Sequence, residues 1–375
     1  MTVRKIYDII IIGGGLAGLT CALHLSNGHL KILLIEKHEY PHHKVCGEYV
    51  SNEVLPYLNS LGVDPLALGA KKITHFELSN NNGDQLKTKL PLGGFGLSRY
   101  AFDNLLYETI KDKVDVFFDV VESISFEDNL FTITTQSGQF YTADYVIGAF
   151  GKRSNIDSFM KRKFMQHPSP WLAVKAHYKY DFPDDTVALH NFDGGYCGLS
   201  QTETNAVNAC YLTTYKSFKR YGNISKFQNR ILAENPHLDK FFNEAEPLFD
   251  KPLSISQISF QQKLAVEKHI FMIGDCASLI HPLCGNGMAM AIHSAKIFSE
   301  IFLKELSIGN VNRLQLESDY IRNWNENFSR RLKNGKRIQN LLLRPTITSV
   351  GFSIAKKFPS ILPGMIKRTH GEPIV

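Results

Sequence analysis

Apolar and polar residues alternate with different periods along this chain, and the changes of period predict a mixed α/β protein. Two continuous apolar runs, 6–12 and 30–35, flank residues 16–25, whose apolar positions have helical spacing. Continuous apolar runs are typical of parallel strands buried on both faces. The pattern therefore predicts a strand, a helix over 16–25 and a second strand that ends at Glu36.

The middle of the chain continues with shorter elements. A helix is expected around 52–61 and another from Ser98 or Tyr100 onward. Alternating or apolar runs predict strands. They lie near 73–79, 114–118, 130–135, 138–142, 145–148, 171–180, 186–191, 196–200 and 206–212. Asp193-Gly194-Gly195 predicts a hairpin in the later group, which looks like a second sheet.

The last third of the chain is predicted to be mainly helical. A short apolar strand at 269–273 precedes Gly274-Asp275, and a helix is expected over 286–306. A long amphipathic helix then covers 313–343. Its apolar stripe is predicted to contain Leu314, Ile321, Trp324, Phe328, Leu332, Ile338 and Leu342.

Composition places the chain among ordinary globular proteins. Its 375 residues are 43% hydrophobic and 21% charged, which favours two or three folded domains. The apolar run at the N-terminus stops at Gly13, too early for a signal peptide, and no run is long enough to span a membrane. A cytoplasmic location is expected, with peripheral membrane contact as an alternative.

Cysteine and histidine usage indicates no metal site. The six cysteines form no CxxC pair, and the 14 histidines form no HExxH motif and no cluster with cysteine. We expect free thiols, no bound metal and no nucleic-acid partner.

Charge is distributed unevenly. The net charge is +6, yet residues 327–371 contain ten Lys and Arg and no Asp or Glu. One interpretation is a solvated basic face on C-terminal helices. The alternative is contact with an anionic membrane surface or an acidic acyl-carrier protein.

The glycine motif after the first strand predicts a dinucleotide site. Gly13-x-Gly15-x-x-Gly18 follows a strand and opens a helix, and Glu36 ends the second strand 18 residues after the last glycine. Gly13 would permit a tight turn, Gly15 a close approach to pyrophosphate, and Gly18 close helix packing. The helix N-terminus would attract the phosphates, and Glu36 would accept hydrogen bonds from ribose.

Four further segments resemble the para-hydroxybenzoate hydroxylase and geranylgeranyl reductase superfamily of FAD-dependent oxidoreductases. Residues 97–103 resemble its Arg-x-x-(Phe/Leu)-Asp segment, 148–154 its second fingerprint, and 274–287 its third. Residues 44–51 resemble the Cys-Gly-Glu/Gly segment of the geranylgeranyl-reductase-like proteins. The third fingerprint also makes chemical sense alone, since Asp275 follows a strand where a carboxylate can accept hydrogen bonds from a sugar-like chain.

The resemblance implies an α/β fold of the GR2 or para-hydroxybenzoate hydroxylase type. A discontinuous Rossmann-like FAD-binding domain would comprise 1–75, 95–155 and 268–310, with an inserted substrate-binding β domain at 76–94 and 156–267. Residues 311–375 would form a C-terminal helical region. The residues expected to bind FAD are Gly13, Gly15, Leu16, Ala17, Gly18, Glu36, Lys37, Lys44, Cys46, Gly47, Arg99, Val121, Gly151, Gly274, Asp275, Pro282, Gly285, Asn286, Gly287 and Met288.

Cys46 and Tyr49 are the expected catalytic residues, because the resemblance places their segment beside the isoalloxazine ring. Either could donate a proton to a substrate, although Cys46 could equally be a structural thiol. Cys284 is a second thiol candidate.

The resemblance predicts an enzyme but leaves its reaction open. The first hypothesis is an NAD(P)H-dependent monooxygenase that hydroxylates a hydrophobic aromatic or polyketide-type substrate through a flavin C4a-hydroperoxide. The second is a reductase of isoprenoid or polyketide C=C bonds, and the third is a non-catalytic flavin-binding protein. Phe150 replaces an aspartate usual in the second fingerprint, and the Trp-x-Trp-x-Ile-Pro segment of flavin-dependent halogenases is absent.

A hydrophobic small-molecule substrate is expected from the β domain and the C-terminus. Aromatic residues of the β domain could line its pocket, and residues 347–366 mix apolar and basic side chains that could cap a lipid-like tunnel or touch a membrane. The aromatic candidates are Phe182, Phe192, Tyr196, Tyr211 and Phe260.

Overall fold

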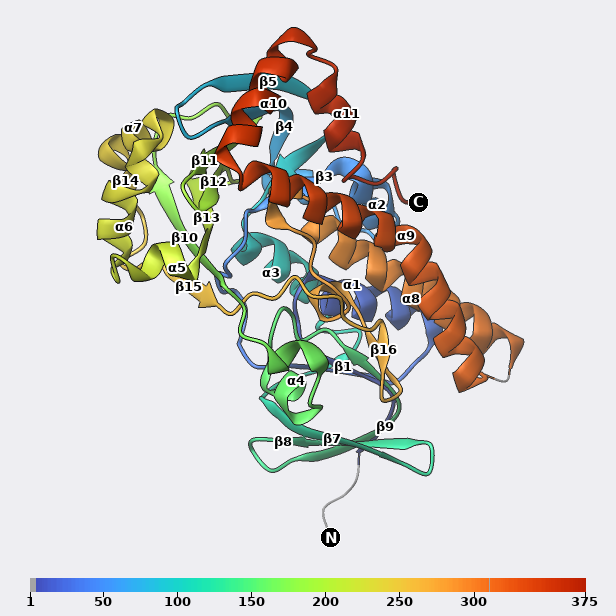
Figure 1. The fold of residues 1–375 in the computed structure, drawn as a ribbon. Helices are drawn as coiled ribbons and strands as arrows, with labels where there is room; N and C mark the ends of the chain where they lie inside the picture. Colours follow the sequence, from blue (N-terminus) through green and yellow to red (C-terminus); the bar gives the residue numbers. More distant parts are fainter. Residues whose placement is uncertain (1–4, 310) are drawn as a thin grey trace.

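A computed structural model describes residues 5–309 and 311–375, and two sheets organise them (Figure 1). The first sheet contains β1 (Lys5–Ile12), β2 (Ile32–Glu36), β6 (Asp115–Phe118), β9 (Phe140–Gly148) and β17 (Ile270–Met272), all parallel, in the order β17-β9-β1-β2-β6. β16 (Val266–Glu267) pairs with β17, and β7 (Val121–Glu127) and β8 (Leu130–Thr135) extend from β9 as antiparallel strands.

Helices cover this sheet and fix the glycine turn. α1 (Leu16–Leu25) packs between the sheet and α8 (Gly287–Ile308), and α3 (Arg99–Ile110) packs on α1. β1 and α1 have the bounds expected from the sequence within one residue. The alternation of two apolar strands with one apolar helix is thus sufficient to specify this βαβ unit.

The second sheet has the strand order β14-β10-β13-β12-β11-β4-β5-β3, and β15 pairs with β10. These strands are β3 (Tyr49–Ser51), β4 (Lys71–Ser79), β5 (Gln85–Gly96), β10 (Trp171–Lys179), β11 (Thr186–Phe192), β12 (Gly195–Gln201), β13 (Val207–Thr214), β14 (Glu246–Pro247) and β15 (Leu253–Ser256). β11 and β12 form the hairpin expected at Asp193-Gly194-Gly195. β4 runs across the boundary placed at residue 75, and β5 was not expected as a strand.

Short α-helices follow strands of both sheets in the chain. They are α2 (Leu55–Ser60), α4 (Asn155–Phe159), α5 (Tyr215–Lys219), α6 (Ile224–Arg230) and α7 (Pro236–Glu244). The aromatic core beneath the second sheet includes Phe192, Tyr211, Phe227 and Phe241. Phe182 packs against the same core.

The C-terminal helices are α9 (Arg313–Leu342), α10 (Pro345–Lys357) and α11 (Ile361–Lys367). The expected stripe of α9 is partly wrong, because Leu314 is 70% exposed and Ile321 is 39% exposed. The buried face instead contains Leu316, Tyr320, Trp324, Phe328, Gly335 and Gln339. This face packs on α8. α10 and α11 follow α9 in the chain and lie beside β4 and β5 (Figure 1).

Candidate active site

A cavity of about 1040 Å³ runs between the two sheets, from the glycine turn to the C-terminal helices. This volume is at the upper end of the range for small-molecule and cofactor sites. It gives room for a dinucleotide and a second ligand.

The described part of the chain contains no helix that is long and apolar enough to cross a membrane.

The glycine turn leaves space at one end of this cavity. Gly13 has φ +107°, and a Cβ there would lie 2.4 Å from the Ala149 carbonyl oxygen. A Cβ on Gly18 would meet the Gly13 carbonyl, so Gly18 packs the helix against the turn and does not line the cavity. A Cβ on Gly15 would meet only Arg99 Nη2, at 3.6 Å. Gly15 therefore presents backbone toward the cavity, as a pyrophosphate site requires.

Glu36 ends β2 beside this turn, and its buried side chain lines the cavity. Its Oε2 accepts a hydrogen bond from Gly14 N at 2.5 Å, and Oε1 accepts one from His38 N at 3.2 Å. Lys37 and Val121 line the same end. A carboxylate held this way has lone pairs left for the hydroxyls of an adenosine ribose.

Arg99 brings positive charge to the glycine turn. Its Nε and Nη2 donate to the two carboxylate oxygens of Asp103, each at 2.7 Å, and Lys44 Nζ reaches Asp103 Oδ2 at 2.9 Å. Burial alone would raise the pKa of Asp103, but the two cations hold it below its usual value. Both Arg99 and Lys44 line the cavity, so the ion-paired cations can face phosphate oxygens.

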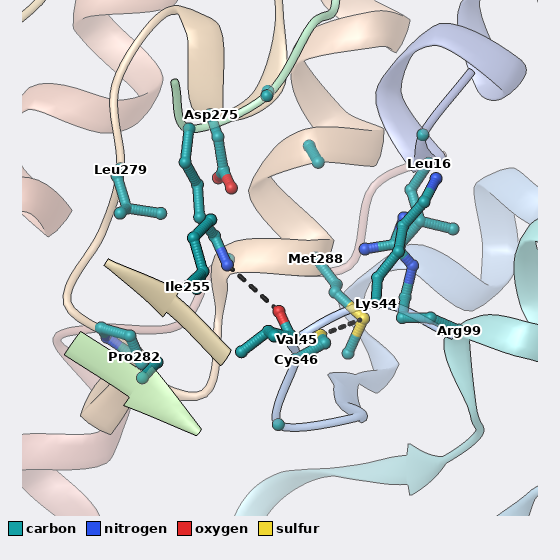
Figure 2. Close-up of a pocket in the computed structure, with 18 of the residues that line it drawn as sticks. Leu16, Lys44, Val45, Cys46, Arg99, Ile255, Asp275, Leu279, Pro282 and Met288 are labelled. Carbon is teal, nitrogen blue, oxygen red and sulfur yellow. Dashed lines mark hydrogen bonds between the residues drawn. The ribbon is translucent and has the colours of Figure 1, made fainter. Parts of the chain in front are cut away.

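Asp275 lies across the cavity from Arg99 (Figure 2). It follows β17, and Gly274 at φ +61° brings this turn against the first turn of α1, where a Cβ would lie 2.9 Å from Ala17 Cβ. Lys263 Nζ fixes the Asp275 carbonyl at 2.9 Å, which leaves the carboxylate directed to the cavity. This carboxylate is suited to bind the hydroxyls of a ribityl chain.

Most of the residues expected to bind FAD line this one cavity. Those placed there by the structure are Gly13, Gly15, Leu16, Ala17, Glu36, Lys37, Lys44, Cys46, Gly47, Arg99, Val121, Gly151, Gly274, Asp275, Pro282, Gly285, Gly287 and Met288. Asn286 lies behind the lining, where its Nδ2 donates to the Thr369 carbonyl at 2.8 Å. The cavity size, the glycine turn and this set of donors and acceptors fit FAD.

The loop 44–48 is pinned by hydrogen bonds to its carbonyl groups. Lys175 Nζ binds the Lys44 carbonyl at 3.3 Å, Lys152 Nζ the Val45 carbonyl at 3.2 Å, and Asn208 Nδ2 the Cys46 carbonyl at 3.2 Å. The Cys46 thiol lies 3.5 Å from the Met288 sulfur, and the two side chains point toward each other in Figure 2. This rigid loop holds the half-buried thiol at the cavity wall.

Tyr49 also lines the cavity, but its hydroxyl donates to the Gly93 carbonyl at 3.4 Å, and burial raises its pKa. Cys284 is buried as well, and burial raises the pKa of its thiol to about 12. Both groups therefore hold their protons firmly.

A buried charge cluster behind the loop was not expected from the sequence. Glu48 is fully buried at φ +55°, and its carboxylate accepts from Lys175 Nζ at 2.5 Å, His177 Nε2 at 2.7 Å and Arg99 N at 2.8 Å. Burial would raise the pKa of Glu48, but Lys175 and His177 hold it low. No local pattern could reveal Lys175 and His177 as partners, because they lie on β10, more than 120 residues from Glu48.

His43, Glu48 and His177 bring ligand atoms within 4.8 Å of one another, which is the spacing of a metal site. The Lys175 ammonium already binds the same carboxylate, and it would repel a divalent cation. This cluster is therefore better suited to hold the loop than to hold a metal.

The second sheet contributes an apolar lobe to the cavity. Its lining includes Phe76, Leu90, Val187, Leu189, Leu199, Leu212, Ile255, Ile258 and Leu279 from strands and loops, and Ile366 from α11. Of the expected aromatic residues, Tyr196 and Tyr211 line the cavity. Phe182 and Phe192 belong to the core beneath the sheet, and Phe260 stacks on His281 at 4.0 Å.

Several polar residues line this lobe, and two of them, Tyr196 and His370, have hydrogen-bonding capacity left for a ligand. Tyr196 Oη accepts from Leu283 N at 3.0 Å, so its hydroxyl can still donate. His370 Nδ1 donates to the Ile366 carbonyl at 3.0 Å, and its buried Nε2 has no hydrogen-bond partner among the described residues. Burial lowers the pKa of His370, so Nε2 is a neutral acceptor. Sequence reasoning missed His370, since nothing local connects the C-terminus to the cavity.

Comparisons with known proteins agree with this geometry. Residues 8–45 match the DAO family model, described as FAD dependent oxidoreductase. A digeranylgeranylglycerophospholipid reductase of Methanococcus vannielii is 23% identical over 351 residues, 90% of this chain and 86% of that one.

Solved structures share the whole fold. A flavin-dependent brominase superposes with a TM-score of 0.78 at 16% identity, covering 97% of this chain and 93% of that one. A probable FAD-dependent monooxygenase of Pseudomonas aeruginosa gives 0.74 at 14% identity, covering 93% and 100%. These matches confirm the fold expected from the sequence.

Proposed function

We propose that this FAD-dependent oxidoreductase is an NAD(P)H-dependent monooxygenase that hydroxylates an apolar aromatic or polyketide-type substrate. Bound FAD would supply the redox chemistry, taking electrons from the nicotinamide donor and activating oxygen. The net reaction consumes S–H, O₂, NAD(P)H and a proton, and forms S–OH, water and NAD(P)⁺.

The observation that carries this proposal is the pair of polar groups in the apolar lobe. Tyr196 can donate to a substrate oxygen and His370 Nε2 can accept from a substrate hydroxyl, while apolar side chains surround both. A plain hydrocarbon would leave these buried groups without partners, at a cost of about 1–3 kcal/mol each. An oxygenated aromatic or polyketide satisfies them.

The protein's own residues would hold the substrate and exclude water. The loop 44–48 is fixed by three carbonyl contacts, so it would form a rigid wall against the isoalloxazine. α11 closes the lobe with Ile366. Exclusion of water protects reactive oxygen chemistry from hydrolysis and uncoupling.

The second candidate is reduction of isoprenoid or polyketide C=C bonds, and the half-buried thiol of Cys46 favours it as a proton donor. The reductase of Methanococcus vannielii, which is alike over most of its length, adds support. Tyr49 is less suitable, because its hydroxyl is bonded to Gly93 and its pKa is raised.

Isotope-labelled oxygen separates the two reactions. The FAD-loaded protein is supplied with NADH or NADPH and a panel of long-chain phenols, polyketide phenols and isoprenoid lipids. The monooxygenase proposal predicts oxygen uptake equal to product formed, with one labelled oxygen atom per product. Unlabelled product that has gained two hydrogens, formed equally well without oxygen, would instead establish the reductase.

Variants of the two polar groups provide the control. His370→Phe and Tyr196→Phe should each raise KM for a hydroxylated substrate by about tenfold or more, since one hydrogen bond is lost. Phe76→Leu, an apolar exchange in the same lobe, should change KM much less. Equal effects of all three would exclude recognition of a substrate oxygen by these groups.

A further inference from the structure

The two C-terminal helices have apolar side chains on opposite faces. Phe352 and Leu362 face inward and are 4% and 9% exposed. On the outer side, Val350 is 60%, Ile354 45% and Phe358 59% exposed. Large apolar side chains that are grouped and exposed on one surface are typical of a surface that contacts protein or lipid.

Exposed basic side chains lie at the ends of the same two helices. Arg344, Lys357, Lys367 and Arg368 are exposed, and Lys356 pairs with Asp84 at 2.8 Å. Because residues 327–371 contain no acid, the positive charge of this region is not neutralised within its own sequence. An exposed apolar row flanked by Lys and Arg is typical of helices that lie in the interface of an anionic bilayer.

The inner side of the same helices belongs to the substrate lobe. Phe352 and Leu362 form one apolar cluster with Leu189, Leu212 and Leu279, and these three residues line the main cavity. These two short helices therefore connect the lobe with the exposed apolar row. In Figure 1, α10 and α11 lie at one end of the molecule, far from the β7–β8 hairpin.

A small second cavity lies beside the main cavity at the C-terminal end of α11. It has a volume of about 130 Å³ and shares Tyr49, Leu90, Ile366 and His370 with the main cavity. Its other lining includes the exposed residues Lys367 and Glu372. The shared residues therefore form a thin wall between the substrate lobe and this outer cavity.

We propose that α10 and α11 dock on an anionic lipid bilayer, and that the apolar substrate passes from the bilayer into the cavity beneath α11. The proposal rests on the apolar substrate of the proposed function. A bilayer is favoured over an acidic carrier protein because the exposed row of Val350, Ile354, Phe358 and Ile361 gains most from insertion into hydrocarbon. An acidic carrier protein would be bound through the basic residues, and that charge complementarity would not explain the four exposed apolar side chains.

Vesicle sedimentation of the FAD-loaded full chain tests the docking without any turnover. We expect binding to phosphatidylcholine vesicles that contain phosphatidylglycerol, weaker binding at high salt, and little binding to phosphatidylcholine alone. Protein that stays in the supernatant with anionic vesicles would overturn the proposal. So would binding to an acidic acyl-carrier protein without binding to vesicles.

Two sets of variants assign the surface. Lys357→Glu with Arg368→Glu should weaken binding to anionic vesicles by about tenfold or more. Val350→Ser with Ile354→Ser and Phe358→Ser should weaken it similarly. The controls are Lys219→Glu with Lys226→Glu, and Leu314→Ser with Phe140→Ser, all exposed and outside α10 and α11. If the controls lose as much binding as the test variants, the surface is wrongly placed.

Tryptophan fluorescence locates the contact directly. Phe358→Trp should shift its emission to shorter wavelength when anionic vesicles are added, whereas Leu314→Trp should not. This measurement does not depend on turnover. A protein that shows the shift at Phe358→Trp but hydroxylates none of the tested substrates would therefore retain the docking proposal and contradict the proposed function. A shift at Leu314→Trp alone would contradict docking through α10 and α11.

Discussion

At the scale of single residues, the site depends on charges that are held in place by partners from distant parts of the chain. Asp103 is the clearest case, because it binds Arg99 and Lys44 while it is 1% exposed. The sequence identified Arg99 and Lys44 through their segments. It could not show that one carboxylate orients both, since Lys44 lies 59 residues from Asp103.

Asp103→Asn tests this arrangement. At neutral pH the change should lower the free energy of unfolding by about 1–3 kcal/mol, because two partly buried cations lose a charged hydrogen-bond partner. The pKa of Asp103 is held below its usual value, so the wild-type advantage is present above about pH 4 and is lost as pH falls further. Urea unfolding at neutral and acidic pH measures both effects.

A surface pair provides the comparison for Asp103. Glu108→Gln removes an exposed ion pair with Lys111, and it should change the free energy of unfolding by only a small fraction of that amount. An Asp103→Asn variant that is as stable as Glu108→Gln would show that the buried ion pairs do not support this region.

At the scale of elements, the spacing of hydrophobic residues predicted the strands of the first sheet well. It predicted the second sheet and the buried face of α9 less well. The helix over 16–25 and the strand over 130–135 have the expected bounds. β5 was missed because Pro91 and Gly93-Gly94 interrupt its alternation of polar and apolar residues. Gly94 is nevertheless required where β3 pairs with β5, because a Cβ there would lie 2.3 Å from the Tyr49 ring. Local pattern cannot register such a contact.

The corrected face of α9 gives a prediction for this element. Phe328 is fully buried against α8, so Phe328→Ala should lower the free energy of unfolding by about 3–5 kcal/mol. Leu314→Ala, on the exposed side, should change it by less than about 0.5 kcal/mol. Thermal or urea unfolding of both variants decides, and equal costs would restore the stripe that was expected from the sequence.

At the scale of the whole molecule, one cavity joins residues from both sheets and the C-terminus. The sequence brought together the residues at one end of this cavity, because the glycine turn, Arg99 and Asp275 each belong to a recognisable segment. It located the apolar lobe only in part, since Tyr196 was expected there, whereas His370 and Leu189 join it through tertiary packing. The two ends differ in how far apart their residues lie in the sequence. A glycine turn is formed by neighbouring residues, whereas the apolar lobe is formed by residues from distant strands and helices.

The central claim is that FAD spans this cavity, with Glu36 at the adenosine end and Asp275 at the ribityl end. Titration of flavin-free protein, followed by absorbance and protein fluorescence, tests it most directly. We predict one FAD per chain, weaker binding of FMN, and a loss of FAD affinity of about tenfold or more for both Glu36→Ala and Asp275→Ala. A folded protein that binds no FAD, or binds FMN as tightly as FAD, would contradict the account.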